Sequence, residues 1–148
     1  MSKTFKGRVV LSGDVSGKAT VSRQAFNTSG SYMENMFAGR TDAAPCTDAS
    51  NKALFGKDLS GAILCVPTTV GSTMGGMCLM GMKAIGVGPE ALLFSKPIDT
   101  LAAAGVLMSD IWKDARIVTV DMLGDEFLET VQMGDPISIN EDGTVEVG

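Results

Sequence analysis

The chain has 148 residues, of which 45% are hydrophobic and 20% are charged. This composition is typical of a single globular domain that buries one sizeable core, and it excludes an intrinsically disordered chain. The net charge of −5 and the lack of a basic cluster argue against a nucleic-acid partner. No apolar run approaches the roughly 20 residues of a membrane span, and the first residues lack the apolar core of a signal peptide. We therefore expect a cytoplasmic protein without membrane contact.

The sequence contains no histidine and three separated cysteines, Cys46, Cys65 and Cys78. The missing histidine excludes His-based general catalysis and a Ser-His-Asp triad. Without a Cys-x-x-Cys pair, we expect no metal site within this chain. Cys65 and Cys78 fall in apolar segments and are expected in the core. Cys46 follows a proline in a polar stretch that also contains Asp48, so it is the one thiol placed to face a ligand.

The N-terminal region predicts two strands joined by a turn that contains glycine. An apolar run covers residues 8–11, a turn region covers 12–17, and a second short run covers 19–21. Asn27, Thr28 and Ser29 then form a polar loop. The residues favour local turn chemistry as the explanation of this loop, and ligand binding is the alternative.

A short helix is predicted directly after this polar loop. Ser31 with Glu34 three residues later fits a capping box, and Gly39 fits the residue just past a helix end. We expect about two helical turns, with three side chains directed toward the core: Met33, Met36 and Phe37.

Strands and helices alternate in the rest of the chain. The apolar run at residues 62–66 is typical of a buried central strand. Further strands are predicted at 91–94 and 117–120, and helices at 77–85, 99–104 (closed by Gly105) and 125–131. Residues 136–147 alternate apolar and polar around a glycine turn, which indicates a hairpin. The pattern predicts one compact α/β domain with β-ribbons at both termini, covering residues 1–148.

The stretch Pro67–Gly76 joins the central strand to the following helix and concentrates small polar residues. Hydroxyls and glycines at the start of a helix, where backbone N–H groups are unpaired, can form a cradle for a carboxylate or phosphate. No lysine follows the glycines, which excludes a nucleotide phosphate loop. The alternative is an ordinary helix cap at Ser72 or Thr73. The residues of the stretch that carry these features are Thr68, Thr69, Gly71, Ser72, Thr73, Gly75 and Gly76.

Four methionines fall within one stretch of nine residues at and before this helix, at positions 74, 77, 80 and 82. They cannot all face one side of a helix. We expect some of them to meet another surface, such as a partner subunit.

The order of these pieces resembles the small subunit of the aconitase X family, a branch of the aconitase superfamily. The resemblance covers nearly the whole chain, and the Gly-Ser step after a strand ending in proline is its most specific part. The motifs are Phe5-Lys-Gly-Arg-Val, the turn from Gly13 to Gly17, Gly56-Lys-Asp-Leu-Ser-Gly61, Ile63-Leu-Cys-Val-Pro67, Gly71-Ser-Thr, and Gly134-Asp-Pro with Gly143-Thr-Val.

The resemblance implies a swivelling β/β/α domain like the C-terminal domain of aconitase. In that family the small subunit pairs with a large subunit that carries the iron–sulfur ligands, and it supplies a serine proposed as catalytic base, which falls on Ser72. The family includes phosphomevalonate dehydratases and cis-3-hydroxy-L-proline dehydratases, so the implied substrate is a small hydroxy acid bearing a carboxylate. Family members often have an arginine where this chain has Val70, and residues 43–48 replace an aromatic, glycine-rich segment. The resemblance therefore leaves the substrate open.

A serine needs help to act as a base. A helix N-terminus contributes at most ~2 kcal/mol, or roughly 1.5 pKa units at 1.36 kcal/mol each, which is too little to form an alkoxide. A cation must come from elsewhere, so the chain is expected to be half of an active site.

Three functions remain at this point. The first is a dehydratase small subunit in which Ser72 takes the proton next to a carboxylate while the partner's centre assists loss of hydroxide. The second is a non-catalytic module that binds a small molecule or carboxylate. The third, a swivelling phosphotransfer domain, is disfavoured because no histidine is present. The expected substrate-binding residues are Thr68, Thr69, Gly71, Thr73, Asn27, Thr28, Ser29, Cys46 and Asp48.

Overall fold

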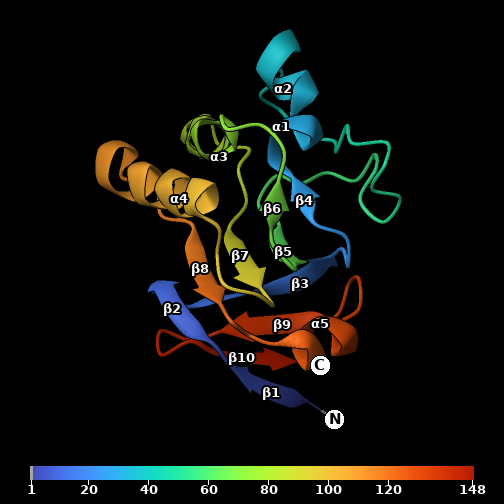
Figure 1. Cartoon of the computed structure of the whole chain (residues 1–148), viewed down its shortest axis with the longest axis vertical. Coiled ribbons are helices and arrows are strands. Elements are labelled where there is room, and N and C mark those ends of the chain that lie inside the picture. The colour runs from blue at the N-terminus through green and yellow to red at the C-terminus, as the bar shows by residue number, and fades with distance from the viewer. Residues whose placement is uncertain (1) are drawn as a thin grey trace.

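The computed structural model describes residues 2–148, which form ten strands and five helices (Figure 1). The strands are β1 (Lys3–Lys6), β2 (Arg8–Leu11), β3 (Val15–Val21), β4 (Phe26–Asn27), β5 (Ile63–Val66), β6 (Thr69–Val70), β7 (Ala91–Phe94), β8 (Val118–Asp121), β9 (Pro136–Ile139) and β10 (Thr144–Val147). The helices are α1 (Thr28–Ser31), α2 (Met33–Ala38), α3 (Gly75–Ala84), α4 (Thr100–Lys113) and α5 (Asp125–Thr130).

Eight of the strands form one sheet in the order β1-β10-β9-β3-β5-β7-β8-β2. The strands β3, β5, β7 and β8 run parallel to one another, and the remaining pairings are antiparallel. The two strands at the ends of this order, β1 and β2, are consecutive in the chain and are separated by Gly7 alone. One bent strand therefore connects both edges, and the sheet is nearly closed.

Gly7 is required at this bend because the backbones approach closely. A Cβ atom there would lie 2.5 Å from the carbonyl oxygen of Asp121. The Gly7 N–H donates to the carbonyl of Gly143 at 3.2 Å, which ties the bend to the hairpin turn between β9 and β10.

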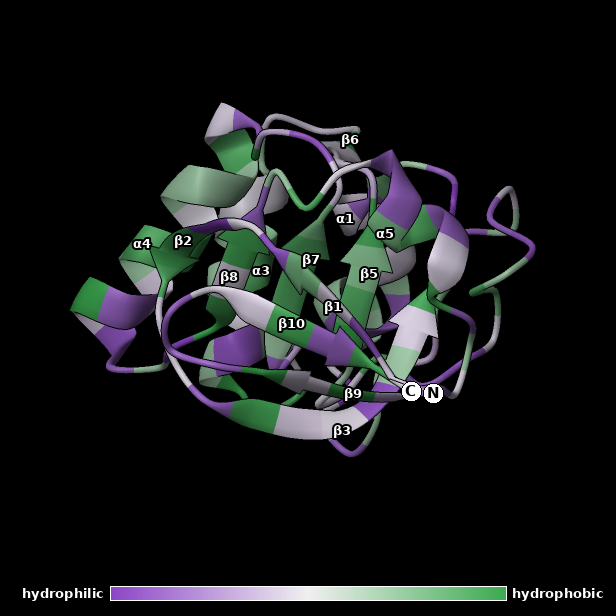
Figure 2. Cartoon of the chain, turned by 90° about the horizontal axis from the view of Figure 1, so that it is seen from below, coloured by the Kyte–Doolittle hydropathy of each residue, from purple (hydrophilic) through white to green (hydrophobic). Residues whose placement is uncertain are grey.

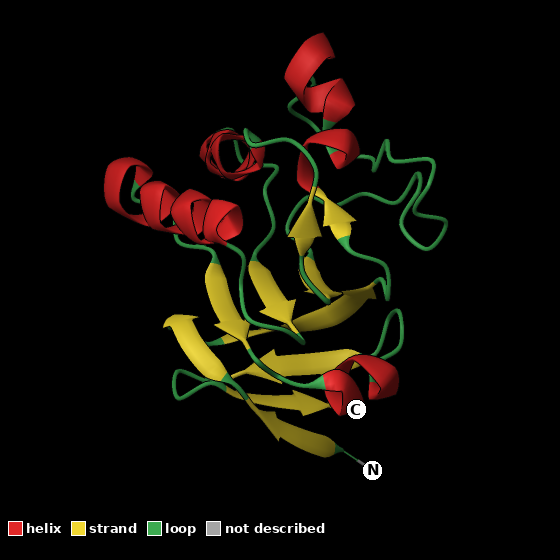
Figure 3. Ribbon diagram, viewed as in Figure 1, coloured by secondary structure: helices red, strands yellow, loops and turns green. Residues whose placement is uncertain are grey.

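The central strands separate two hydrophobic cores. In β5, Leu64 and Val66 face the core beneath α3 and α4, whereas Ile63 and Cys65 face the core beneath the β1/β9/β10 ribbon and α5. Because both faces are covered, the strand is apolar throughout, as expected for buried parallel strands. Figure 2 shows this hydrophobic character along β5, β7 and β8. Figure 3 shows the helices α3 and α4 together on one side of these strands.

Helices α3 and α4 cross with their backbones in contact. A Cβ on Gly76 would lie 2.5 Å from the Leu101 carbonyl oxygen, and a Cβ on Gly105 would lie 2.6 Å from the Gly76 carbonyl oxygen. The prediction that Gly105 closes a helix after residue 104 is therefore wrong. The helix runs on to Lys113, because this glycine serves helix packing instead of termination.

The short helix at residues 33–38 forms where it was predicted, but with the opposite orientation. Met33, Met36 and Phe37 are 45%, 36% and 76% exposed, so the prediction that they face the core is wrong. The buried residue of α2 is Asn35, whose side-chain amide donates to the carbonyls of Arg40 and Ala43, both at 2.8 Å. This polar anchor turns the apolar side chains outward.

The predicted ends of this helix had different outcomes. Gly39 does end α2 in the left-handed conformation, with φ 70°. The predicted capping box is absent, since α2 begins after Tyr32 without a side-chain cap, and the buried Ser31 hydroxyl has no hydrogen-bond partner among residues 2–148. Tyr32 itself is fully buried against Phe26, with ring centroids 6.1 Å apart.

The predicted polar loop at residues 27–29 is wrong, because Asn27 ends β4 and Thr28 and Ser29 begin α1. The remaining predicted strands and helices are confirmed within a few residues, including the β9–β10 hairpin around Gly143. Two cysteines and the clustered methionines also behave as expected from the sequence. Cys65 and Cys78 are buried, and of the four clustered methionines, Met74 and Met77 are exposed while Met82 is buried. None of the helices in the described part of the chain is long and apolar enough to cross a membrane.

Candidate functional site

Two polar segments that are distant in the sequence meet through a two-stranded parallel sheet. Strand β4 pairs with β6, with Phe26 opposite Thr69 and Asn27 opposite Val70. The Phe26 N–H also donates to the carbonyl of Thr68 at 2.9 Å. The residues that follow each strand, at 28–31 and 71–74, are therefore placed side by side above the helical side of the sheet (Figure 1).

Ser72 lies in the turn between β6 and α3 and is exposed. Its Oγ accepts a hydrogen bond from the Met74 N–H at 3.1 Å, and its carbonyl accepts from the Gly75 N–H at 3.0 Å. The alternative that Ser72 or Thr73 is the helix cap is wrong, because α3 begins after Met74 and has no side-chain cap. A donor aimed at Oγ favours negative charge on that oxygen, and the hydroxyl keeps its own proton free to donate.

Gly71 allows the Ser72 turn to lie directly on Asn27. Its φ is +105°, and a Cβ there would come within 2.5 Å of Asn27 Oδ1. The same Oδ1 accepts from the Gly30 N–H at 3.0 Å and so caps α1. Asn27 therefore has the local role expected from turn chemistry, and it also lies beside the Ser72 turn.

The cradle predicted around the glycines of this stretch forms only in part. Gly75 and Gly76 are buried, against Thr28 and against α4 respectively. Thr28 is itself 2% exposed, so it packs at the start of α3 and does not face a ligand in this chain.

The threonines of the stretch take different environments. The Thr69 hydroxyl and N–H both donate to Asp99 Oδ1, while Asp99 Oδ2 accepts from the Ala102 N–H at 3.0 Å and caps α4. This links β6 to α4, so Thr69 has a structural role. Thr68 is half-buried, and Thr73 is exposed beside Ser72.

Ser72 and Asn27 line one hollow of about 360 Å³. Its wall is apolar and its polar groups are neutral, including Ser29, whose buried hydroxyl has no partner among the described residues. The lining contains no charged side chain: it consists of Asn27, Ser29, Gly30, Met33, Met36, Phe37, Ser72 and Met74.

Cys46 and Asp48 do not line this hollow. The prediction that Cys46 is placed to face a ligand is wrong, because its side chain is 2% exposed and packs in the core that contains Tyr32. Its N–H donates to Lys57 and its carbonyl accepts from Gly56, both at 2.8 Å. Proline and polar neighbours suggested a surface loop, but these long-range bonds fold the segment inward. Asp48 Oδ1 accepts from the N–H and the hydroxyl of Ser50, which closes a local turn.

The cysteines do not fit an iron–sulfur cluster. All three are free and buried, and residues 2–148 contain no group of three or more His, Cys, Asp or Glu side chains that could hold a metal ion. Burial raises the pKa of the Cys78 thiol to about 11 and raises that of Cys65 further. The three thiols are enclosed in the fold and do not gather into a ligand set.

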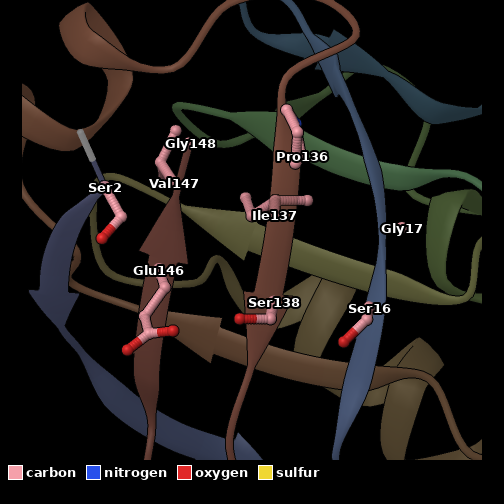
Figure 4. Close-up of a pocket in the computed structure, with 9 residues that line it drawn as sticks. All are labelled: Ser2, Ser16, Gly17, Pro136, Ile137, Ser138, Glu146, Val147 and Gly148. Carbon is pink, nitrogen blue, oxygen red and sulfur yellow. The ribbon is translucent and has the colours of Figure 1, made fainter.

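A second hollow, of about 260 Å³, lies on the β3/β9/β10 ribbon (Figure 4). It shares no residue with the Ser72 hollow. The side chains of Ser16, Ser138 and Glu146 point to its side of the ribbon, and Glu146 is its single charged residue. Ser138 lies opposite both Glu146 and Ser16 in the sheet, but no hydrogen bond joins these side chains in the described part of the chain.

The chain is similar to known proteins over nearly its whole length. A model of the aconitase X swivel domain matches residues 4–147. The chain is 29% identical over 144 residues to the phosphomevalonate dehydratase small subunit of Archaeoglobus fulgidus, covering 97% of each chain. It is 28% identical over 159 residues to the cis-3-hydroxy-L-proline dehydratase of Hypocrea jecorina, covering 96% of this chain and 25% of that protein.

A solved structure supports the same relationship. The chain is similar to aconitase X of Thermococcus kodakaraensis, at 26% identity and a TM-score of 0.81, covering 99% of this chain and 98% of that one. The mixed α/β fold with strands at both termini, predicted from the sequence, is confirmed.

Proposed function

Because the chain belongs to the aconitase X family, we propose that it is the small subunit of a heteromeric hydro-lyase that dehydrates a small hydroxy acid of the hydroxyproline or phosphomevalonate type. Such a reaction removes a proton from the carbon next to a carboxylate and hydroxide from the neighbouring carbon, and the two leave as water. We assign the proton to Oγ of Ser72. The observation that carries this assignment is an exposed hydroxyl that lines a hollow and accepts a backbone hydrogen bond.

The physical chemistry of this serine requires a second chain. The N-terminus of α3 contributes at most ~2 kcal/mol, and a hydrogen bond from Met74 to a charged oxygen contributes about 1.5–3 kcal/mol. At 1.36 kcal/mol per unit, these lower the hydroxyl pKa by roughly three units. That leaves the hydroxyl far from ionising near pH 7, and the hollow contains no cation. A partner must therefore supply the positive charge.

The surface around Ser72 suits such a partner. Five exposed apolar side chains lie on this surface, and together we call them the apolar rim: Met33, Met36, Phe37, Met74 and Met77. The first four line the Ser72 hollow, and Met77 lines an adjoining hollow that shares Met36 and Met74 with it. Methionine-rich surfaces adapt to a partner because the side chain is flexible and polarisable. We propose that the large aconitase X subunit covers the rim, completes the hollow and carries the iron–sulfur cluster, for which residues 2–148 of this chain offer no ligand set. The free cysteines suit a cytoplasmic complex.

The alternative is a non-catalytic module that binds a small molecule or carboxylate in the same hollow. The Ser72 hydroxyl keeps its proton to donate, so it could orient a ligand without taking a proton. Removing the hydroxyl separates the two functions, since the loss of an orienting hydrogen bond lowers turnover far less than the loss of a catalytic base does.

The test is turnover by the complex of this chain with its large subunit. We expect Ser72→Ala to abolish dehydration, because the proposed base is lost. The two subunits should still associate, because the change removes only one exposed hydroxyl. Ser16→Ala makes the same chemical change at an exposed position on β3 and serves as the matched control. If Ser72→Ala keeps more than about a tenth of the parent kcat, its loss is under ~1.4 kcal/mol and the base assignment is wrong.

A further inference from the structure

We infer that Asn27 binds the substrate, with its side-chain NH2 group donating a hydrogen bond to a neutral oxygen of the molecule held in the Ser72 hollow. This inference rests on the proposed function, because the ligand is the hydroxy acid that Ser72 acts on. From the binding residues expected on the sequence it selects Asn27, and it adds the chemical class of the group that Asn27 recognises.

The two ends of the Asn27 amide have different roles. Oδ1 is occupied, since it accepts from the Gly30 N–H at 3.0 Å. Nδ2 makes no hydrogen bond to any described residue, and it is not among the enclosed side-chain atoms that lack a partner. Because Oδ1 is fixed as an acceptor, the group left for a ligand is a donor.

The amide is also held rigidly beside Ser72. Pairing of β4 with β6 sets Asn27 opposite Val70, two residues before the serine. The backbone at Gly71 lies against the amide so closely that a Cβ would come within 2.9 Å of Cγ. Both Asn27 and Ser72 line the hollow. A donor fixed in this way loses little entropy when a substrate binds, which favours specific recognition.

The apolar wall of the hollow determines which kind of ligand group can accept a hydrogen bond from Asn27. An anionic group placed against Met33, Met36 and Phe37 would lose hydration without meeting a counter-charge on this chain. A neutral oxygen such as a hydroxyl needs only the amide donor, and the hydrocarbon beside it can pack on the apolar wall. The substrate's ionised groups accordingly face the large subunit.

A kinetic test uses two substitutions that keep the α1 cap. Asn27→Asp retains an acceptor oxygen for Gly30 but replaces the donor, and Asn27→Ser retains a capping oxygen without adding charge. In the complex, we expect both to raise KM by about tenfold to a hundredfold, the cost of losing one buried hydrogen bond, while kcat for Asn27→Ser changes less than about threefold. If Asn27 only caps α1, both variants keep the parent KM, and that result overturns the inference.

A second readout does not depend on turnover. Only the small chain is labelled with ¹⁵N, in the Ser72→Ala complex, and the side-chain NH2 resonance of Asn27 is followed while cis-3-hydroxy-L-proline or phosphomevalonate is added. We expect one compound to shift this resonance. The Asn35 resonance should stay in place, because that amide is bonded inside the chain.

The two readouts separate this inference from the proposed function. If the Asn27 resonance shifts and the Ser72→Ala complex keeps its turnover, the inference about Asn27 stands and the assignment of Ser72 as the base is wrong. Turnover that depends on Ser72, with no Asn27 shift from either compound, retains the base and overturns the inference. No shift from either compound overturns it in every case.

Discussion

Two polar regions of this chain differ in how far the chain satisfies them by itself. At one, Asp121 is 0% exposed, yet its carboxylate accepts from Arg8 Nε at 2.9 Å, from Arg8 Nη2 at 2.6 Å and from the Ile98 N–H at 2.7 Å. At the other, Ser72 and Asn27 line a hollow without a charge, and Ser29 has a buried hydroxyl without a partner in the described residues. The first region is complete within the chain, whereas we propose that another molecule completes the second.

The hydrogen bonding of each region indicates its role. A buried carboxylate is tolerated only when paired and hydrogen-bonded, and Asp121 thereby fixes the edge strand β2 and the segment before α4. Polar groups left without internal partners add nothing to folding. At the Ser72 hollow, a ligand or partner subunit can supply the bond that the Ser29 hydroxyl lacks.

The largest effect on stability is expected at the completed region. Asp121→Ala removes two bonds to Arg8 and leaves the Ile98 N–H without its acceptor, so we expect the free energy of unfolding to fall by about 2–4 kcal/mol. Urea denaturation of the isolated chain measures it. Glu126→Gln is the control, because the Lys3–Glu126 ion pair is exposed on both sides and should contribute nothing measurable. A loss at Asp121 no larger than at Glu126 would remove the contrast between the two regions.

A smaller effect is expected at the helix crossing that holds the start of α3. Gly76→Ala would place a Cβ 2.5 Å from the Leu101 carbonyl oxygen, and because backbone gives little, we expect a loss of about 1–3 kcal/mol. The turn that contains Ser72 should shift with the helix, so kcat of the complex should fall as well.

Gly81→Ala is the matched control for this crossing. Gly81 lies in the same helix, and a methyl group added there would have nothing within 4 Å, so the change should stabilise the helix by about 0.5–1 kcal/mol. Thermal unfolding of the two variants measures both effects. If Gly76→Ala stabilises the chain as Gly81→Ala does, the helices do not cross in backbone contact.

The sequence predicts well those parts whose environment is encoded locally. Strands such as residues 63–66 are continuous apolar runs, and the β9–β10 hairpin has alternation and a turn glycine. The glycine at position 105 shows the limit of local reasoning. Read alone it indicates a helix end, but in the fold it is the point where a second helix touches.

The candidate site was predictable only in pieces. The Ser72 turn has a local signature, whereas its contact with Asn27 arises from a two-residue strand pairing that no periodicity reveals. Cys46 has polar neighbours that suggest exposure, yet backbone bonds to Lys57 and Gly56 draw it into the core. The outward direction of Phe37 depends on the anchoring of Asn35, which is likewise a tertiary effect.

The central claim is that the region around Ser72 is completed by the large subunit, and the affinity between the two chains tests it most directly. Phe37 on the apolar rim and Ile111 on the outer face of α4 are both apolar and are 76% and 72% exposed. Phe37→Asp and Ile111→Asp therefore place the same charge on equally exposed positions at two different surfaces. Isothermal titration of each variant with the large subunit gives the dissociation constants.

We expect Phe37→Asp to weaken association at least about a hundredfold, the range for an aromatic residue at the centre of an interface, and Ile111→Asp to leave it within about threefold of the parent chain. A parent-like affinity for Phe37→Asp, with weakening confined to Ile111→Asp, would place the large subunit on α4 and contradict the claim.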